Sequence, residues 1–352
     1  MPGQNEGCMK RELVGMLPAE MEQFVVSLGA KPFRARQIAA WIYKRGVTDI
    51  EQMTDLSRTL RLLLSDNARL TLPFVRRVLT AEDGAIKFLL VLSDGAAVES
   101  VIIPDEGRTT LCVSSQAGCA LGCAFCMTGS LGLARDLTAG EIVGQVLVAA
   151  NHLKERGGVL TNVVFMGMGE PLLNYEELKR ALAIILSDWG LCFSWRHVTV
   201  STAGIPEMIA RLGTEVLVNL AVSLNAPDDD TRSLIMPINK KYPLTSLMES
   251  LREYPLKRGR RITLEYVLLS GVNDTDDHAR ALASLVKGIP VKINLIPFNP
   301  YDGAPFSRPD DERIGRFQEI LIGAHLNAII RKSKGGAINA ACGQLAAASC
   351  AQ

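Results

Sequence analysis

Three cysteines, Cys119, Cys123 and Cys126, form the pattern Cys-x3-Cys-x2-Cys. Their thiolates can ligate three irons of one four-iron cubane, a cluster that usually takes four cysteines. One iron is then left without a protein ligand, and an open coordination site is a place where chemistry can occur. Two cysteines alone could be half of a zinc site or a redox pair, but three at this spacing favour the iron–sulfur cluster.

A second motif, Gly167-Met-Gly169-Glu170-Pro171, follows a strand-like run at residues 162–166. It lacks the third glycine of the dinucleotide-binding Gly-x-Gly-x-x-Gly pattern, because position 172 is leucine. A turn with exposed backbone groups and one carboxylate could instead bind an ammonium group, such as that of S-adenosylmethionine. Together with the cysteine triplet, the motif indicates an enzyme that cleaves S-adenosylmethionine reductively to make radicals.

More polar residues stand where other strand-like runs end. They are Ser201, the run Ser223-Leu224-Asn225, and Asn299. Each alone would be interpreted as a turn-forming residue. Parallel α/β sheets, however, place their ligands at the carboxyl ends of the strands. The shared position of these residues therefore suits a bound nucleoside and amino acid.

The other cysteines have no chemistry of their own in the sequence. Cys112 lies in a strand-like run and Cys342 in a tail of small residues, so burial is the default interpretation for the first and an incidental thiol for the second. Glu99 would be an outward-facing strand carboxylate. Cys8, Cys192 and Cys350 have no motif around them and are interpreted as core or surface thiols.

Strand-like and helical patterns alternate from residue 110 to residue 296. This alternation predicts a parallel sheet with right-handed helical crossovers. Six units are fewer than the eight of a closed barrel, so we expect an α/β fold built on an open or partial (β/α)6 barrel. The expected strands are 110–114, 162–166, 197–201, 216–223, 262–269 and 291–296, and the expected helices lie near 138–155, 175–188, 204–212, 228–236, 244–257 and 276–287.

The remaining segments divide the chain into four parts. Residues 1–75 show helical spacings without strand-like alternation, and residues 76–108 predict short antiparallel strands that lead into the barrel of residues 109–300. Residues 301–352 predict a helix, a strand and a mobile Gly- and Ala-rich tail. From Arg34 to Arg77, nine basic residues against four acidic ones give a net charge of +5, which suits either a phosphate-binding surface or a solvated helix face.

Composition sets the broad class. The 352 residues are 48% hydrophobic and carry a net charge of +1, as in a folded protein of about two domains. We expect no membrane association and a cytoplasmic location, because there is neither an apolar signal-peptide core nor a run of 18 apolar residues. Four histidines without an i,i+4 pair argue against a histidine-based zinc site.

Taken together, these stretches resemble the RlmN family, the radical SAM enzymes that methylate C2 of adenine in two kinds of RNA. The similarity runs from about residue 25 to residue 347. It is carried by Phe33-Arg-Ala-Arg-Gln37 with Trp41, by the stretch from Cys112 to Cys126, by Gly167-Met-Gly-Glu-Pro-Leu-Leu-Asn174, by Ala221-Val-Ser-Leu224 through Met236-Pro-Ile-Asn-Lys-Lys-Tyr-Pro243, by Asn294-Leu-Ile-Pro-Phe-Asn-Pro300 and by Ala340-Ala-Cys342-Gly-Gln-Leu345.

The resemblance implies a mechanism that uses the two isolated cysteines. One S-adenosylmethionine methylates Cys342, and cleavage of a second by the reduced cluster gives a 5′-deoxyadenosyl radical that takes hydrogen from this methyl group. The carbon radical adds to adenine C2, Glu99 removes the C2 proton, and Cys112 attacks Cys342 to release the product as a disulfide forms.

The resemblance also implies the ligands and partners. A [4Fe–4S] cluster would bind Cys119, Cys123 and Cys126. S-adenosylmethionine would contact Gly169, Glu170, Ser201, Ser223, Leu224, Asn225 and Asn299. The N-terminal helical part would bind RNA, and the substrates would be 23S rRNA and tRNA. An electron donor such as flavodoxin or ferredoxin would reduce the cluster, and the enzyme would be a monomer.

The chain departs from the family at two places. Asn225 stands where the family often has histidine, although an amide can still hydrogen-bond a ribose or a carboxylate. Lys334-Gly-Gly-Ala337-Ile stands where Arg-Gly-x-Asp-Ile is common, and the missing acid could change how the Cys342 segment is held.

Three alternatives remain at this point. A Cfr-like enzyme would methylate adenine C8 with the same cysteine pair. A cluster-bearing protein could bind RNA without catalysis, although Cys112, Cys342 and Glu99 are all present. A zinc protein that uses two of the thiols is the third.

Overall fold

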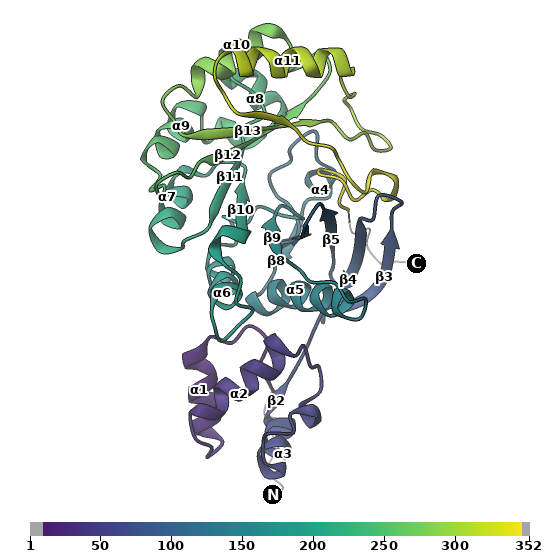
Figure 1. The fold of residues 1–352 in the computed structure, drawn as a ribbon, viewed down its shortest axis with the longest axis vertical. Helices are drawn as coiled ribbons and strands as arrows, with labels where there is room; N and C mark the ends of the chain where they lie inside the picture. The colour runs from purple at the N-terminus through teal and green to yellow at the C-terminus, as the bar shows by residue number, and fades with distance from the viewer. Residues whose placement is uncertain (1–9, 347–352) are drawn as a thin grey trace, which may run out of the picture.

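The computed structural model describes residues 10–346 and is built on one open sheet of ten strands (Figure 1). The strand order is β14-β13-β12-β11-β10-β9-β6-β5-β4-β3, so β14 and β3 are the two edges. Seven adjacent strands are parallel. Their bounds are β6 (Arg108–Cys112), β9 (Asn162–Phe165), β10 (Val198–Thr202), β11 (Asn219–Ser223), β12 (Ile262–Leu268), β13 (Val291–Pro297) and β14 (Ala328–Ile330).

The six expected barrel strands are confirmed, and a seventh joins them. The last strand of the chain, expected outside the barrel, pairs in parallel with β13. The antiparallel strands β3 (Phe74–Thr80), β4 (Ile86–Val91) and β5 (Ala97–Asp105) continue the same sheet, because β5 pairs with β6. They are therefore a direct extension of the barrel sheet.

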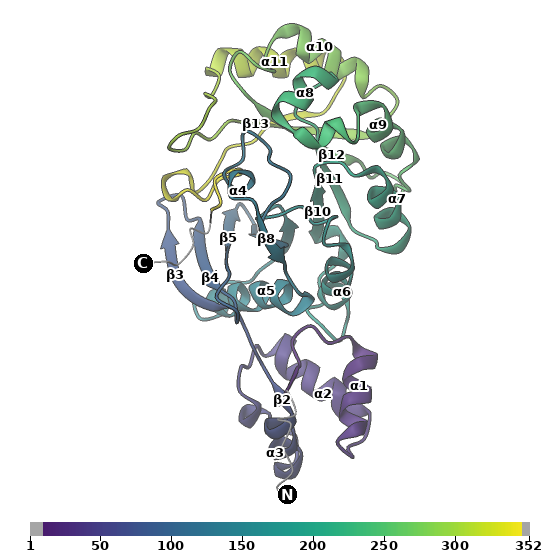
Figure 2. The same ribbon diagram turned by 180° about the vertical axis from the view of Figure 1, so that it is seen from behind.

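The crossover helices follow the outer side of the curved sheet (Figures 1 and 2). They are α5 (Ala139–Lys154), α6 (Tyr175–Leu186), α7 (Pro206–Glu215), α8 (Asp229–Ile235), α9 (Leu244–Glu253) and α10 (Asp276–Leu285), with α11 (Asp311–Gly323) before β14. Helix α5 begins with a capping box, in which the Thr138 hydroxyl accepts from the N–H of Glu141 and the Glu141 carboxylate accepts from the N–H of Thr138. None of the described helices is long and apolar enough to cross a bilayer.

The N-terminal domain is mainly helical, as expected, with one addition. Its helices are α1 (Pro18–Ser27), α2 (Phe33–Ala39), which continues as a π-helical turn over Ala40–Lys44, and α3 (Arg58–Asn67). Two short parallel strands, β1 (Arg11–Glu12) and β2 (Ala68–Arg69), join its ends. The sequence did not predict them, because two residues are too few to show an alternating pattern.

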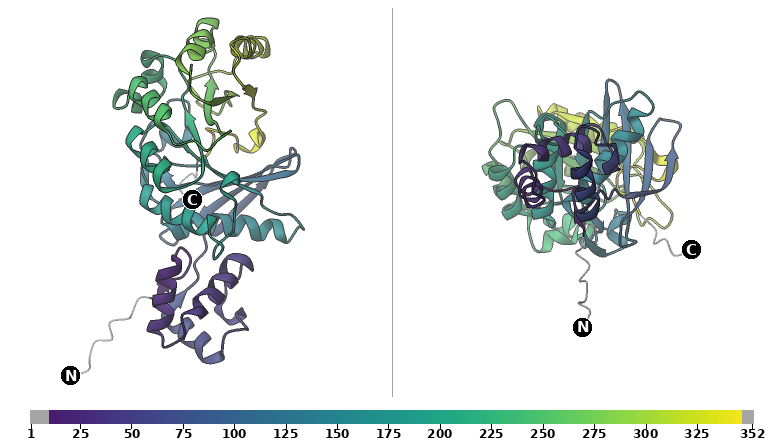
Figure 3. Two further views of the ribbon diagram at one scale, coloured as in Figure 1. Left: turned by 60° about the vertical axis from the view of Figure 1, so that its left-hand side comes forward. Right: turned by 90° about the horizontal axis from the view of Figure 1, so that it is seen from below.

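The N-terminal domain lies against the outer helices α5 and α6, below them in Figure 1 and at the lower end of the left view in Figure 3. The Glu20 carboxylate accepts two hydrogen bonds from Arg180 of α6, at 2.8 and 2.7 Å. Arg36 pairs with Asp188 in the loop that follows α6, at 2.9 Å. These contacts place α2 next to that loop.

After β14, residues 331–346 cross to the other side of the open sheet; we call this segment the strap. The Gly335 N–H donates to Asp83 at 2.7 Å, and Lys334 donates to the carbonyl of Pro104, so the strap reaches the β3–β4 turn and the end of β5. Ala337 is exposed. The anchors of the strap therefore come from residues other than position 337, where the family often has an acid.

Substitution of Gly335 by alanine should loosen the strap. Gly335 has a φ of +73°, and a Cβ there would lie 2.8 Å from the Cβ of Ala340. We expect the free energy of unfolding to fall by about 2 kcal/mol, because alanine is strained at this φ and lacks space. Thermal denaturation and hydrogen exchange of the strap would measure the change.

The matched control is Gly336→Ala, since a Cβ at Gly336 would have no atom within 4 Å. Equal effects of the two substitutions would contradict the packing argument.

Candidate active site

The loop with the cysteine triplet leaves β6 and is enclosed by a small hairpin, β7 (Gln116–Gly118) and β8 (Leu133–Asp136). The Cys119 N–H donates to the carbonyl of Gly132 at 2.8 Å, and the Cys126 N–H donates to that of Cys123 at 3.0 Å. Gly118 has a φ of +85°, and a Cβ there would collide with the Gly132 carbonyl. The sequence did not predict this hairpin, which shapes the start of the triplet loop.

The three thiols of the triplet are partly buried, and they lie near enough to raise one another's pKa. Burial raises the pKa of Cys119 to about 11. Burial also raises the pKa of Cys123, and the neighbouring Cys126 and Cys119 raise it further. The loop therefore gathers three thiols in a partly desolvated place.

The Gly167–Pro171 motif packs against the end of β6. A Cβ at Gly167 would lie 2.7 Å from the Val113 carbonyl carbon, and one at Gly169 would lie 2.5 Å from the Cβ of Gln116. Gly169 also has a φ of +95°. Glycine is required at both positions because another strand end approaches the backbone closely.

The Glu170 carboxylate lies at the centre of this packing. It accepts from the N–H groups of Ala203, at 2.7 Å, and Leu172, at 3.0 Å. Burial raises its pKa, and these hydrogen bonds oppose the shift. Glu170 also lies near enough to Cys119 and Cys123 to raise the pKa of both thiols. The predicted ammonium ligand and the cysteine triplet thus belong to one site.

Arg232 organises the ends of β10 and β11 from beneath the site. It is fully buried and donates to the carbonyls of Ala203, Ser223 and Leu224 at 2.6, 3.2 and 3.0 Å. Burial lowers its pKa to about 10. Ser201 is buried on β10 beside this cluster, so three of the predicted strand-end residues meet here. The sequence offered no sign of Arg232, because it follows three aspartates and is typical of a solvated helix start.

The two predicted asparagines are engaged with the protein itself. Asn225 is buried with a φ of +59°; its Oδ1 accepts from the Val267 N–H at 2.8 Å and its Nδ2 contacts Met236 Sδ at 3.1 Å. The Asn299 amide donates to the carbonyl of Cys342 at 3.3 Å. Asn225 thus has a structural role at the end of β11, and Asn299 touches the strap.

The strap brings Cys342 to the mouth of the barrel. Met127 and Thr128, the two residues directly after the triplet, bind the strap. The Met127 N–H donates to the carbonyl of Gly343 at 2.8 Å, and the Thr128 hydroxyl donates to the carbonyl of Leu345 at 2.6 Å. Cys112 is buried on β6, and burial raises its pKa, with a further rise from Cys342. Cys342 as a whole residue is exposed, but its thiol is surrounded by protein atoms. The resulting desolvation raises the pKa of the thiol to about 11. Both thiols are free, and Cys342 lies near enough to Cys112 to act on its pKa.

Glu99 points into this same region and is not the outward carboxylate that its strand pattern suggested. It is 5% exposed and pairs with the equally buried Lys87 of β4 at 3.0 Å. Its other oxygen accepts from the Ala346 N–H at 3.0 Å, and Lys87 donates to the Asn339 carbonyl at 3.0 Å. Lys87 and Glu99 together hold the strap on both sides of Cys342, at Asn339 and at Ala346.

Comparison with known proteins agrees with this arrangement. The model for the ribosomal RNA large subunit methyltransferase N-terminal domain matches residues 11–70, and the radical SAM superfamily model matches residues 113–283. A protein of Anaeromyxobacter sp. (strain Fw109-5), named dual-specificity RNA methyltransferase RlmN, is 52% identical over 332 residues, which are 93% of this chain and 88% of that protein. The chain belongs to the RlmN family.

Other RlmN-family relatives give the same result. A Geobacter sulfurreducens protein of the same name is 49% identical over 334 residues, or 95% of this chain and 91% of that protein. A crystal structure of a radical SAM methyltransferase from Sphaerobacter thermophilus superposes with a TM-score of 0.93 at 46% identity, covering 96% of this chain and all of the other. The expected α/β radical SAM fold is confirmed.

Membership of the radical SAM superfamily implies a [4Fe–4S] cluster and S-adenosylmethionine, and the donor set fits them. Within residues 10–346, no three Cys, His, Asp or Glu side chains converge as they would on a single metal ion. A cubane places each thiolate on a different iron and needs no such convergence. Three clustered thiols beside a buried carboxylate at the strand ends suit a cluster with one open iron.

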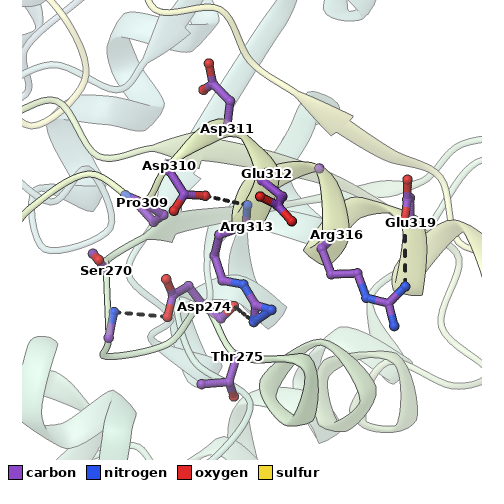
Figure 4. Close-up of a pocket in the computed structure, with 12 residues that line it drawn as sticks. Ser270, Asp274, Thr275, Pro309, Asp310, Asp311, Glu312, Arg313, Arg316 and Glu319 are labelled. Carbon is purple, nitrogen blue, oxygen red and sulfur yellow. Dashed lines mark hydrogen bonds and ion pairs between the residues drawn. The ribbon is translucent and has the colours of Figure 1, made fainter.

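Two other features of this RlmN-family chain lie outside the site. Cys192 is exposed and has no chemical partner in the described residues, in agreement with the surface-thiol interpretation; Cys8 and Cys350 lie outside the described residues. A hollow of about 860 Å³ lies where α10 and α11 begin (Figure 4). Its two arginines are paired, Arg316 with Glu319 of the hollow at 3.9 Å and Arg313 with the neighbouring Asp276 at 2.9 Å, and no predicted site residue lines it.

Replacement of Lys87 by methionine should leave the Glu99 carboxylate buried without its partner. We expect the free energy of unfolding to fall by about 3–5 kcal/mol, as is typical when one partner of a buried ion pair is removed. Chemical denaturation would measure the loss.

The pairing can be isolated with Glu99→Gln and with the double variant. The double variant should lose clearly less stability than the sum of the single losses, because neither charge is then left alone. Strictly additive losses would contradict direct pairing.

Proposed function

We propose that this protein is a radical SAM RNA methyltransferase that methylates C2 of a specific adenine in 23S rRNA and in tRNA. The observation that carries the proposal is the position of two free cysteines, Cys112 and Cys342, beside the cysteine triplet. Cys342 lies on a strap bound directly to the triplet loop, and Cys112 lies at the end of the strand that leads into it. A carrier thiol and a resolving thiol at a radical-generating site match covalent methyl transfer.

In this proposal Cys119, Cys123 and Cys126 hold the [4Fe–4S] cluster. When bound, the cluster and two molecules of S-adenosylmethionine per turnover supply a methyl group and a 5′-deoxyadenosyl radical. Glu170, already buried beside the thiols, would receive the ammonium group of the cofactor. The other proposed contacts are Gly169, Ser201, Ser223, Leu224, Asn225 and Asn299. At Asn225 the backbone N–H would make the contact, because the side-chain amide is engaged and the carbonyl accepts from Asn273 at 2.7 Å.

The three catalytic residues have distinct tasks. Cys342 carries the methyl carbon as a thioether and becomes joined through it to adenine C2. Glu99 takes the C2 proton, and the one electron lost by the radical adduct at the same stage would return to the cluster when it is bound. The Cys112 thiolate then attacks the Cys342 sulfur, so that a disulfide forms and the carbon–sulfur bond to the RNA breaks. Its electron pair stays on carbon, which takes up a proton to become the methyl group. Since burial raises the pKa of Cys112, it stays a neutral thiol until the strap and substrate rearrange.

The strap must move during this cycle. Asn299, a proposed cofactor contact, donates to the Cys342 carbonyl, and Glu99, the proposed base, accepts from the Ala346 N–H. Neither group can serve its ligand fully while it holds the strap. Binding of cofactor and RNA would therefore compete with the contacts that keep Cys342 in place.

The partners follow from the family and from the charge distribution. The N-terminal domain, which contains most of the Arg34–Arg77 segment of net charge +5, would bind the RNA backbone. An acidic electron-transfer protein such as flavodoxin or ferredoxin would reduce the cluster. We propose that the enzyme acts as a monomer in the cytoplasm.

The product identifies the reaction. Purified enzyme with a reductant, S-adenosylmethionine and 23S rRNA or tRNA should yield 2-methyladenosine, measured by mass spectrometry of the digested RNA. Formation of 8-methyladenosine would instead assign the Cfr-like reaction, and the absence of methylation from well-reconstituted enzyme would leave a cluster-bearing RNA-binding protein.

Substitution of each of the two cysteines should stop the reaction at a different step. Cys342→Ala should abolish methylation, because no carrier thiol remains. Cys112→Ala should accumulate a covalent protein–RNA adduct, since nothing cleaves the carbon–sulfur bond. Denaturing gel electrophoresis with and without ribonuclease would detect the adduct.

Cys192→Ala is the matched control and should keep full activity, because Cys192 is exposed and remote from the motif. Methylation by the Cys342→Ala variant would show that the covalent mechanism is wrong.

A further inference from the structure

Basic residues gather at the amino-terminal ends of β10, β12 and β13, opposite the end that holds the cysteine triplet. The turn before β12, Lys257-Arg258-Gly259-Arg260-Arg261, carries four positive charges in five residues. Lys257, Arg258 and Arg261 are exposed. Among residues 10–346 no carboxylate pairs with any of these four side chains. A cationic surface without internal partners is available to an anionic ligand.

The neighbouring strands extend this surface. The pairing of β12 with β13 places Thr263 opposite Lys292, so Lys292 lies beside the basic turn. Partial burial lowers the pKa of Lys292; Glu265 opposes the shift, and Arg331, Arg108 and Arg260 add to it. The positive groups are thus close enough to repel one another. The Glu265 side chain is buried and bonded to Asn294 at 2.9 Å, so it does not cover the surface.

An aromatic ring lies among these charges. The guanidinium groups of Arg196 and Arg260 lie over the Trp195 ring, at 4.8 and 4.5 Å from its centroid. Asn219 of β11 fixes this turn by donating to the carbonyls of Arg196 and Val198 at 2.9 and 3.1 Å. Stacking holds both guanidinium groups in defined places, and arginines held in this way are suited to bidentate contacts with phosphate.

One end of this surface lies in a loop that contacts the N-terminal domain. Trp195 and Arg196 end the α6–β10 loop, and the beginning of that loop pairs with Arg36 of α2 through Asp188. In Figure 1 the N-terminal helices α1 and α2 lie below α6. RNA bound to the N-terminal domain could therefore reach Trp195 and Arg196 through this loop.

We propose that Trp195, Arg196, the Lys257–Arg261 turn and Lys292 form a second RNA-binding surface, which contacts the phosphate backbone of the substrate away from the target adenine. The proposal rests on the proposed function in RNA methylation. An acidic electron donor is the other anionic partner, but it must approach the cluster at the opposite ends of the strands. The two ends of the strands are far apart, because strand β13, with seven residues, is about 20 Å long.

The test neutralises the exposed turn in the full-length, cluster-reconstituted enzyme, as the triple variant Lys257→Gln, Arg258→Gln, Arg261→Gln. RNA binding is measured by fluorescence anisotropy over a range of salt concentrations. We expect Kd for substrate RNA to rise about tenfold near physiological salt and the slope of log Kd against log salt to fall by about 2, since each lost phosphate contact contributes about 0.7–0.9. The value of kcat/KM should fall mainly through KM.

The matched control removes three positive charges elsewhere, as Arg280→Gln, Arg308→Gln, Arg316→Gln on the α10–α11 side. These arginines pair with acidic neighbours, so their loss should leave the salt slope nearly unchanged. Equal slopes and affinities for the two triple variants would overturn the proposed surface.

Two further outcomes separate the hypotheses. In the first outcome, the wild-type enzyme binds and methylates RNA, and the turn variant is impaired only in the reduction of its cluster by flavodoxin. This result would assign the surface to the electron donor and overturn the RNA proposal. Wild-type enzyme that binds RNA in a turn-dependent way without methylating it would retain the surface and refute the proposed function.

Discussion

The buried ion pair between Lys87 and Glu99 is the interaction on which the arrangement of the site depends. Two opposite charges inside a protein are tolerated only when they meet with good geometry and further hydrogen bonds. Here the further bonds come from Asn339 and Ala346 of the strap. The pair therefore fixes β4 against β5 and at the same time holds the segment that carries Cys342.

A second constraint is the common direction of the parallel strands. Seven strands end at the same side of the sheet, and the loops that follow them must fit into a small volume. This crowding explains the glycines at positions 167 and 169, where neighbouring backbone approaches within contact distance. It also explains Arg232, whose guanidinium satisfies carbonyl groups from two strand ends that would otherwise lack partners.

The sequence predicted what local patterns encode. Apolar runs revealed the six strands, the helical spacings between them located the crossover helices, and cysteine spacing located the centre of the site. It could not predict Lys87 or the orientation of Glu99, because in an alternating strand each resembled a solvated charge, and the contact that buries them comes from residues about 250 positions away. The engagement of Asn225 and the β7–β8 hairpin likewise depend on tertiary contacts. The ligand roles of the individual site residues remain proposals.

The strap also determines when the site can first exist. The triplet ends at Cys126, and the proposed carrier thiol follows only at Cys342, after all the remaining strands of the sheet. Domains fold progressively as synthesis proceeds from the N-terminus at about 5–20 residues per second, so the cluster loop is made about 10–40 s before the strap that packs against it. During that interval the triplet thiols lack the strap contacts at Met127 and Thr128. The nascent triplet loop is therefore more open to cluster delivery, and to oxidation, than the same loop in the finished fold.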